Sequence, residues 1–301
     1  MTSEAVPAAA ALPGGRDRRP RVQLLAQIFL VSASALWLLP ILFALYIAVR
    51  PYSDTRKHGY VSLPHDLTLS NFSDAWSQAD MGRFFWNSAL ITLPAVVIVL
   101  CLAAGAAFVL TRVNVRINVA LLILFTAGNL LPQQVIITPL FRMYLKIPLP
   151  SFLADSGLMY NSAFGLIVIN VAFQLGFCVF VLSNYMKSVP DEMYEAALVD
   201  GASLWTRFWK LTVPLCRPAL AALATLLTTW IYNDFFWAIT LMSSGDKRPV
   251  TSALANLQGQ FVSNQNLIAA GAMIAAIPTL VVYILLQKQF IAGLSLGSSK
   301  G

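Results

Sequence analysis

The sequence is poor in charged residues. Asp, Glu, Lys and Arg make up 11% of the 301 residues, whereas hydrophobic residues make up 58%. A typical soluble domain has about a quarter of its residues charged and uses them to cover its water-facing surface. A chain with so few charges cannot cover such a surface. A water-soluble globular domain is therefore excluded, and a lipid bilayer is the expected solvent.

Several kinds of site are lacking as well. The two histidines, His58 and His65, share one polar loop with no third ligand clustered beside them, so we expect no metal site. The three cysteines, Cys101, Cys178 and Cys216, show no C-x-x-C spacing and are expected to be small core residues. No G-x-x-x-x-G-K-[ST] segment and no His, Cys and acid grouping occurs. We therefore expect no catalytic residue and no cofactor bound by this chain.

Long apolar runs are abundant instead. Each run has about 20 residues or more, which suffices to cross a hydrocarbon layer of about 30 Å at about 1.5 Å per residue. They predict an all-α integral membrane protein with six transmembrane helices. The predicted spans are residues 24–49, 87–110, 119–141, 163–182, 218–242 and 267–286. Residues 1–23 are predicted to be a disordered cytosolic tail, and residues 287–301 a cytosolic C-terminal tail.

The net charge of +7 is distributed between the apolar runs and forms no basic stripe, so we expect no nucleic-acid partner. Cytoplasmic loops of membrane proteins carry an excess of Lys and Arg. The larger share of the Lys and Arg residues falls on segments that are predicted to lie on the same side of the membrane as the N-terminus. Arg112, Arg116 and Lys187 are among them. The pattern predicts a multi-pass protein of the cell membrane with both termini in the cytosol.

The segment 183–217 is too polar to span a membrane and too apolar for a plain loop. Ser188 is expected to cap a helix that ends at Gly201 in a left-handed conformation. A second short helix is expected to begin at Leu204 and to stop before Pro214. The first helix carries an alanine-lined face and lies across the cytosolic side. On chemistry alone, that face docks into a groove on another protein or rests on lipid headgroups.

The same segment contains a spaced pattern. Glu195-Ala196-Ala197 is followed by three residues, Gly201, nine residues and then Leu211-Thr212-Val213-Pro214. It resembles the EAA signature of binding-protein-dependent ABC permeases, with Leu and Val in place of the usual Ile and Leu. The resemblance implies a cytosolic coupling helix between the fourth and fifth spans, docked on an ATPase. The implied ATPase-coupling residues are Glu195, Ala196, Ala197, Asp200, Gly201 and Pro214.

Two further segments are similar to the carbohydrate branch of these permeases, as in the smaller permease subunit of maltose importers. One is W-I-Y-N-D-F-F-W at residues 230–237, with Asp234 where that branch has Glu. The other is the C-terminal tail, which in that branch reaches between the ATPase subunits. The tail residues implied for that contact are Gln287, Lys288, Gly293, Lys300 and Gly301.

The resemblance implies that residues 24–286 form the permease domain of an ATP-driven importer. This subunit would supply half of the translocation pathway for a di- or oligosaccharide. The implied partners are a second homologous permease, a dimeric cytosolic ABC ATPase that carries ATP and Mg²⁺, an extracytoplasmic sugar-binding protein and the lipid bilayer. The alternatives are an importer for a non-sugar solute such as a polyamine or a glycerophosphodiester, a secondary carrier or channel, and a membrane enzyme.

Polar and aromatic side chains inside the predicted spans are candidates for the pathway. Amides in spans also hold helices together, and that alternative stays open. Asp234 lies about 24 Å along its span, in the outer half, and structure or gating is favoured over direct contact with sugar. The pore or substrate candidates are Asn129, Gln133, Gln134, Asn170, Gln174, Tyr232, Asn233, Asp234 and Trp237.

Overall fold

The computed structural model of the chain describes residues 19–113, 117–128, 132–257 and 264–295. Within these ranges the fold is helical, and the β-type pairing in them is an isolated bridge between Pro148 and Leu158. The chain divides into two units, residues 1–46 and 47–301, which are described separately. Predictions for residues 1–18, Asn129, Lys300 and Gly301 lie outside the described residues.

The first unit is formed by α1 (Arg19–Ala48), whose last two residues already belong to the second unit. Its apolar part, residues 23–48, is long enough to cross a membrane and covers the first predicted run. Pro40 lies inside this helix. A proline in a spanning helix frees one carbonyl, which neighbouring groups in a bundle satisfy.

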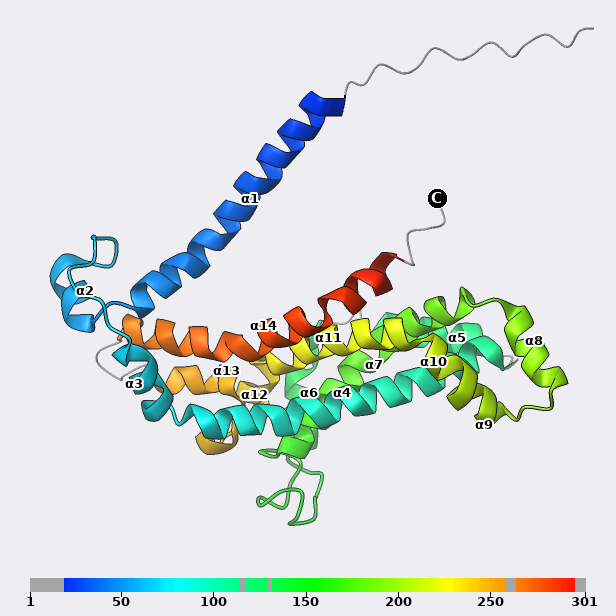
Figure 1. The fold of residues 1–301 in the computed structure, drawn as a ribbon. Helices are drawn as coiled ribbons and strands as arrows, with labels where there is room; N and C mark the ends of the chain where they lie inside the picture. The colour runs from blue at the N-terminus through cyan, green and yellow to red at the C-terminus, as the bar shows by residue number, and fades with distance from the viewer. Residues whose placement is uncertain (1–18, 114–116, 129–131, 258–263, 296–301) are drawn as a thin grey trace, which may run out of the picture. The chain divides into compact units, whose positions relative to one another are not determined.

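Three long apolar helices form the frame of the second unit: α4 (Met81–Arg112), α7 (Ala163–Lys187) and α14 (Gln265–Ser295). α4 packs along α7, and α11 (Arg217–Tyr232) packs against both α4 and α14 (Figure 1). Ala103, Ala104 and Ala107 are buried in the same core cluster as Cys178. Small side chains let the two backbones approach, so this part of α4 serves helix packing.

Two of the predicted spans are broken. The third run divides into α5 (Asn118–Gly128) and a second piece, η1 (Gln133–Ile136) with α6 (Ile137–Tyr144), bent by 88°. The fifth run divides into α11 and α12 (Phe236–Leu241), with Asn233 at the end of α11. The runs 119–141 and 218–242 are therefore not continuous helices. In the described residues, four helices are long enough to span, or up to six if the bent pairs within 118–144 and 204–232 each count as one span.

Polar connections gather at two opposite ends of the second unit (Figure 1). One end carries α2 (Tyr52–His58), α3 (Ser70–Gln78), η3 (Gly245–Lys247), α13 (Val250–Ala253) and η4 (Leu254–Leu257). The other end carries α8 (Asp191–Val199), α9 (Leu204–Thr206), η2 (Arg207–Thr212) and α10 (Val213–Leu215). α4 joins them, because Arg83 near its start pairs with Asp246 and Arg112 at its end pairs with Asp191.

Candidate functional site

The N-cap of α8 lies two residues after the expected one. Pro190 occupies the N-cap position, and Asp191 and Glu192 lie in the first turn, where the helix dipole favours negative charge. Ser188 instead ends α7, and its hydroxyl donates to the Tyr185 carbonyl at 2.7 Å. The expectation that Ser188 caps α8 is therefore wrong.

The end of α8 has the expected left-handed residue. Gly201 has φ of 72°. The N–H of Ala202 donates to the Ala197 carbonyl at 2.9 Å, and the N–H of Gly201 donates to the Leu198 carbonyl at 3.0 Å. This pair of bonds is a Schellman motif, which satisfies carbonyls that the helix leaves unpaired. The prediction of a glycine-terminated helix is confirmed.

The second short helix is longer than expected. Helical backbone continues from Leu204 to Leu215, so the expected stop before Pro214 is wrong. Pro214 lies in the first turn of α10, and residues 207–212 form a π-helical turn. A π turn shifts the hydrogen-bond register, and here the Thr212 hydroxyl donates to the Arg207 carbonyl at 3.1 Å. This segment then meets α11 at an angle of 71°.

α8 is attached to the end of α4 through Arg112. The guanidinium pairs with Asp191, donates to the Met186 carbonyl, and donates to the Val189 carbonyl at 3.0 Å. It also lies 3.9 Å from the centre of the Tyr194 ring. One cation therefore holds the end of α7 and the start of α8 together.

Tyr194 provides the second attachment of α8. Its hydroxyl forms a buried hydrogen bond of 3.1 Å with the Thr212 hydroxyl on η2. Sequence reasoning missed both Arg112 and Tyr194. The available signals were local: Arg112 is a basic residue in the last turn of a span, and Tyr194 is an aromatic residue three positions after Asp191. Nothing in a single sequence shows that the two are in contact.

The free side of this end of the molecule is strongly apolar. Val199 is 88% exposed and Trp205 is 71% exposed, and other large apolar side chains are exposed around them. We call this surface the α8 face; its apolar members are Met193, Leu198, Val199, Leu204, Trp205 and Trp209. The predicted residues Glu195, Ala196 and Asp200 are exposed beside it, and Ala197 is half-buried. Exposed apolar side chains gathered on one segment mark a contact with a protein or with a membrane.

Polar candidates converge on a cavity of about 300 Å³ between α7, the break after α11, and η1. Predicted candidates that line it are Gln133, Asn170, Gln174, Asn233, Asp234 and Trp237. Sequence reasoning missed the remaining lining residues, which are Phe173, Thr229 and Trp230. Phe173 and Trp230 could have been found as aromatic residues one helical turn from predicted amides. The spans bring together side chains that are about 100 positions apart in the sequence.

Asp234 organises one wall of this polar cavity. Its Oδ2 accepts from Asn170 Nδ2 at 3.1 Å, and its Oδ1 accepts from the Trp237 backbone N–H at 3.1 Å. The Thr251 hydroxyl donates to the Asp234 backbone carbonyl at 3.3 Å. The carboxylate thus ties α7 to the break and satisfies an N–H at the start of α12. This supports the structural reading of Asp234.

Trp237 offers an unused donor at the same place. Its side chain is 2% exposed, and among the described residues its indole Nε1 has no hydrogen-bond partner. Its ring centre lies 5.4 Å from that of Phe173. A buried N–H without an acceptor is costly, and this one belongs to a residue that lines the polar cavity.

Two other candidates do not reach the polar cavity. Tyr232 is buried on the opposite side of α11, where its hydroxyl donates to the Ala275 carbonyl on α14 at 2.9 Å. Gln134 is exposed and does not line the cavity. The helical period separates Tyr232 from Asn233 and Asp234, because adjacent residues on a helix point about 100° apart.

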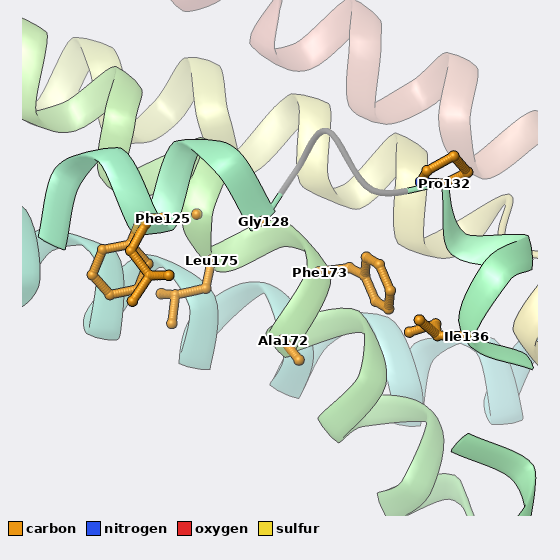
Figure 2. Close-up of a pocket in the computed structure, with 9 residues that line it drawn as sticks. Phe125, Gly128, Pro132, Ile136, Ala172, Phe173 and Leu175 are labelled. Carbon is orange, nitrogen blue, oxygen red and sulfur yellow. The ribbon is translucent and has the colours of Figure 1, made fainter. Parts of the chain in front are cut away.

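An apolar cavity of about 270 Å³ lies on the other side of Phe173, at the bend between α5 and η1 (Figure 2). Its lining residues are Leu124, Phe125, Gly128, Pro132, Ile136, Ala172, Phe173, Leu175 and Gly176. These side chains offer no hydrogen-bonding group, so this cavity suits hydrocarbon and is unsuited to a hydroxyl-rich solute.

The C-terminal residues assigned to the tail are partly helical. α14 extends to Ser295 and therefore includes Gln287, Lys288 and Gly293. The Gln287 side chain donates to the Ile284 carbonyl at 3.1 Å. The tail is thus an extension of the last helix as far as it is described.

Comparisons with known proteins agree on one family. The family described as "Binding-protein-dependent transport system inner membrane component" matches residues 100–294. Over 239 residues the chain is 33% identical to the melibiose/raffinose/stachyose import permease protein MelC of Bacillus subtilis, covering 79% of this chain and 83% of that protein. It is 30% identical to the diacetylchitobiose uptake system permease protein NgcG of Streptomyces coelicolor, over 92% of this chain and 89% of that protein.

Two solved structures share the fold. One belongs to a bacterial ABC transporter involved in the import of the acidic polysaccharide alginate, with a TM-score of 0.75 and 22% identity over 92% of this chain and 100% of that chain. The other is a bacterial alginate ABC transporter in complex with an alginate pentasaccharide-bound periplasmic protein. Its TM-score is 0.65, at 18% identity over 88% and 93% of the two chains.

Proposed function

The chain belongs to the binding-protein-dependent transport system inner membrane component family, and from this premise we propose that it is the permease subunit that carries a di- or oligosaccharide in an ATP-driven importer. Relatives at 33% and 30% identity are named for the uptake of melibiose, raffinose and stachyose and of diacetylchitobiose. These solutes share many neutral hydroxyl groups on sugar rings whose C–H faces are apolar.

The observation that carries the cargo assignment is the lining of the polar cavity. It combines amides of Gln133, Asn170 and Gln174 with the rings of Trp230 and Trp237. Sugars need hydrogen-bond donors and acceptors together with flat apolar area. The one carboxylate there, Asp234, is already hydrogen-bonded by Asn170 and by the Trp237 N–H. A polyamine site would instead need carboxylates available to the cargo.

The α8 face is the proposed docking surface for a dimeric cytosolic ATPase, which would bind ATP and Mg²⁺. Its support is the exposed apolar area around Val199 and Trp205, together with the Schellman cap at Gly201 that fixes the end of the helix. Glu195, Ala196, Ala197, Asp200 and Pro214 belong to the same segment. Docking would bury the apolar area, which stabilises the complex.

The path from the ATPase to the cargo runs through Arg112 and the helices it joins. Closure of the ATPase dimer would displace α8, and Arg112 would pass that displacement to α4 and to the end of α7. Because α7 carries Asn170 and Phe173, a rigid shift of α7 would change the polar cavity. Switching by rigid motion of packed elements is the usual means of alternating access.

This chain would supply half of the translocation pathway, and a second homologous permease would complete it in the membrane. A periplasmic sugar-binding protein would deliver the cargo to the end that carries α2, α3 and η3. The complex of the alginate transporter with a periplasmic protein supports a partner of that kind. Both termini and α8 would then face the cytosol, in keeping with the distribution of Lys and Arg.

The experiment is uptake by the complete importer reconstituted in vesicles, with labelled melibiose, raffinose and diacetylchitobiose against labelled putrescine and glycerophosphocholine. The proposal expects ATP-dependent uptake of at least one of the saccharides and none of the charged solutes. Uptake of putrescine or glycerophosphocholine, with no uptake of any saccharide, would contradict the sugar assignment. Uptake without the ATPase or without ATP would indicate a secondary carrier.

A further inference from the structure

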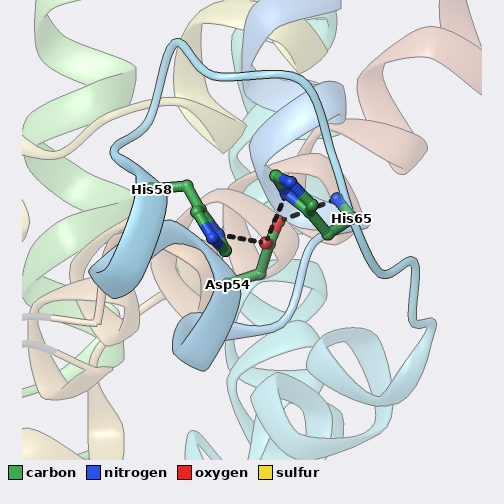
Figure 3. Close-up of side chains that lie close together, drawn as sticks. All are labelled: Asp54, His58 and His65. Atoms are coloured by element: carbon green, nitrogen blue, oxygen red, sulfur yellow. Dashed lines mark hydrogen bonds and ion pairs between the residues drawn. The ribbon is translucent and has the colours of Figure 1, made fainter.

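Three potential metal ligands meet in the polar segment that follows α1 (Figure 3). Asp54 and His58 lie four residues apart on α2, so they share one face of the helix. The chain then turns at Gly59, which has φ of 88°, and returns to place His65 against the same carboxylate. The sequence argument against a metal was the lack of a third ligand near the histidines, and the fold supplies Asp54.

Arg50 fixes the orientation of the Asp54 carboxylate. The arginine is fully buried, and its Nε and Nη2 donate to Asp54 Oδ2 at 2.9 and 2.7 Å. Oδ1 therefore points to the histidines, with His58 Nδ1 at 2.9 Å and His65 Nδ1 at 3.4 Å.

The same arginine also shapes the loop that carries His65. Its Nη1 donates to the carbonyls of Tyr60 and Ser62 at 3.2 and 3.0 Å. α2 is in turn attached to the start of α14, because the Thr55 hydroxyl donates to Asn266 Oδ1 at 2.9 Å. The three ligands therefore stand on a backbone that is held by buried hydrogen bonds.

The spacing of the three ligands fits a small tetrahedral ion. One ligand atom from each residue lies within 4.8 Å of the others. A zinc ion with bonds of about 2.0–2.1 Å has ligand atoms about 3.3 Å apart, so small side-chain rotations would suffice. The two imidazole rings are stacked, with centres 4.0 Å apart. Both histidine side chains are partly exposed, which leaves a fourth position for water.

We propose that Asp54 Oδ1, His58 Nδ1 and His65 Nδ1 form a binding site for a divalent transition-metal ion of the zinc class. Two imidazole nitrogens and one carboxylate are ligands that zinc, copper and nickel accept, whereas magnesium and calcium prefer oxygen ligands throughout. Arg50 acts as the outer partner that orients the carboxylate, as metal-bound carboxylates usually require. The bound ion fastens the loop of residues 59–65 to α2, at the end of the unit opposite α8.

The test is a cobalt titration of the full-length chain in detergent, purified without a polyhistidine tag. These are the two histidines of the sequence, so any imidazole-bound metal reports on this cluster. We expect one Co²⁺ per chain with visible absorption of a four-coordinate site, displaced by one Zn²⁺ and not by Mg²⁺. His58→Gln and His65→Gln should each weaken binding about 10-fold or more, since loss of a contact around a metal typically has effects of that size.

Asp66→Asn is the matched control, because Asp66 is an exposed acid next to His65 and outside the cluster. It should bind cobalt as the parent chain does. Asp54→Asn is not used, because it would leave the buried Arg50 without its partner. Absence of one-to-one binding, or binding that survives the combined His58→Gln and His65→Gln change, overturns the proposal. Neither outcome depends on which solute the importer carries.

Discussion

The α8 face and the polar cavity have opposite characters. On α8 the apolar side chains are outside, with Val199 88% exposed. In the cavity the polar groups are inside, with the amide of Asn170 buried between two helices. A water-soluble domain shows the reverse of both. The exposed apolar side chains fit the proposed docking contact of α8. The polar side chains that line the cavity fit the proposed hydrogen-bonding solute.

The two regions also differ in how they are attached. α8 is joined to the rest of the unit through Arg112 and Tyr194 at one edge. The cavity is built from α7, α11, α12 and η1, so its shape changes when those helices move. The difference suggests a division of labour in which α8 transmits motion and the cavity selects the cargo. The following changes test that division, from the largest expected effect to the smallest.

Replacing Leu198 and Val199 together by Glu should abolish docking of the ATPase. Both side chains are exposed, so the chain should fold, but two charges would be buried in the contact. Loss of about 2 kcal/mol or more at a docking centre corresponds to about 30-fold weaker association. The measurement is co-purification of the ATPase together with sugar uptake. Val61→Glu, at a valine that is 86% exposed at the opposite end, is the control and should have little effect.

Arg112→Ala should separate hydrolysis from uptake. It removes the Arg112 donor from the Met186 and Val189 carbonyls and the cation from Asp191. Charge-assisted hydrogen bonds contribute about 1.5–3 kcal/mol, so uptake per ATP hydrolysed should fall about 10-fold or more. Arg112→Lys should restore part of it, because lysine keeps the charge and loses the planar fork. Arg142→Ala, an exposed arginine in the last turn of α6, is the control.

A parallel fall of hydrolysis and uptake in Arg112→Ala would contradict the separation. So would normal uptake per ATP in that variant. Either result would mean that α8 is positioned by contacts other than the Arg112 cation.

Asp234→Asn and Asn170→Leu should each lower uptake about 5-fold, since a typical hydrogen bond contributes about 1 kcal/mol. Asn170→Leu removes the bond from Asn170 to Asp234 Oδ2, and Asp234→Asn leaves one acceptor oxygen for the two donors that the carboxylate now serves. The loss of uptake in the double variant should therefore be smaller than the product of the two single losses. A double-mutant cycle measures this difference. Thr240→Ala is the control, because its hydroxyl donates to the Phe236 carbonyl in its own helix and it does not line the cavity. Fully additive effects would show that Asp234 and Asn170 act independently.

Gly201→Ala should have the smallest effect, about a 2- to 5-fold loss of uptake. The left-handed conformation costs alanine about 1 kcal/mol, whereas no described atom lies within 4 Å of the added methyl group. Gly201→Asn should transport nearly as well as the parent, because asparagine tolerates this conformation. Equal losses for the two variants would show that the side chain, and not the backbone, matters at this position.

The sequence predicted the features that depend on local spacing. The helix that ends at Gly201 follows from its period and its cap, and amides placed on one face of α7 predicted Asn170 and Gln174 in the cavity. Features that depend on how spans pack were missed. The Arg112 contact with Tyr194 joins α4 to α8, and no local pattern encodes that pairing. The break at Asn233 was missed because no Pro or Gly lies near it and aromatic residues stand on both sides of the Asn233-Asp234 pair.

The histidine cluster illustrates the same limit. The spacing of Asp54 and His58 by four residues was a usable signal, because residues so spaced share a helix face. The approach of His65 depends on the loop that Arg50 organises through the Tyr60 and Ser62 carbonyls. The types of the three ligands, without the geometry of the loop, could not show that Asp54, His58 and His65 lie together.

The most direct test of the account concerns the side of the membrane on which α8 lies and what covers it. Val199→Cys would be placed in a chain whose native Cys101, Cys178 and Cys216 are replaced by serine or alanine. The account predicts that a membrane-impermeant maleimide labels Val199→Cys in inside-out vesicles and not in right-side-out vesicles, and that bound ATPase prevents the labelling. Labelling from the extracytoplasmic side, or labelling that the ATPase leaves unchanged, would contradict it.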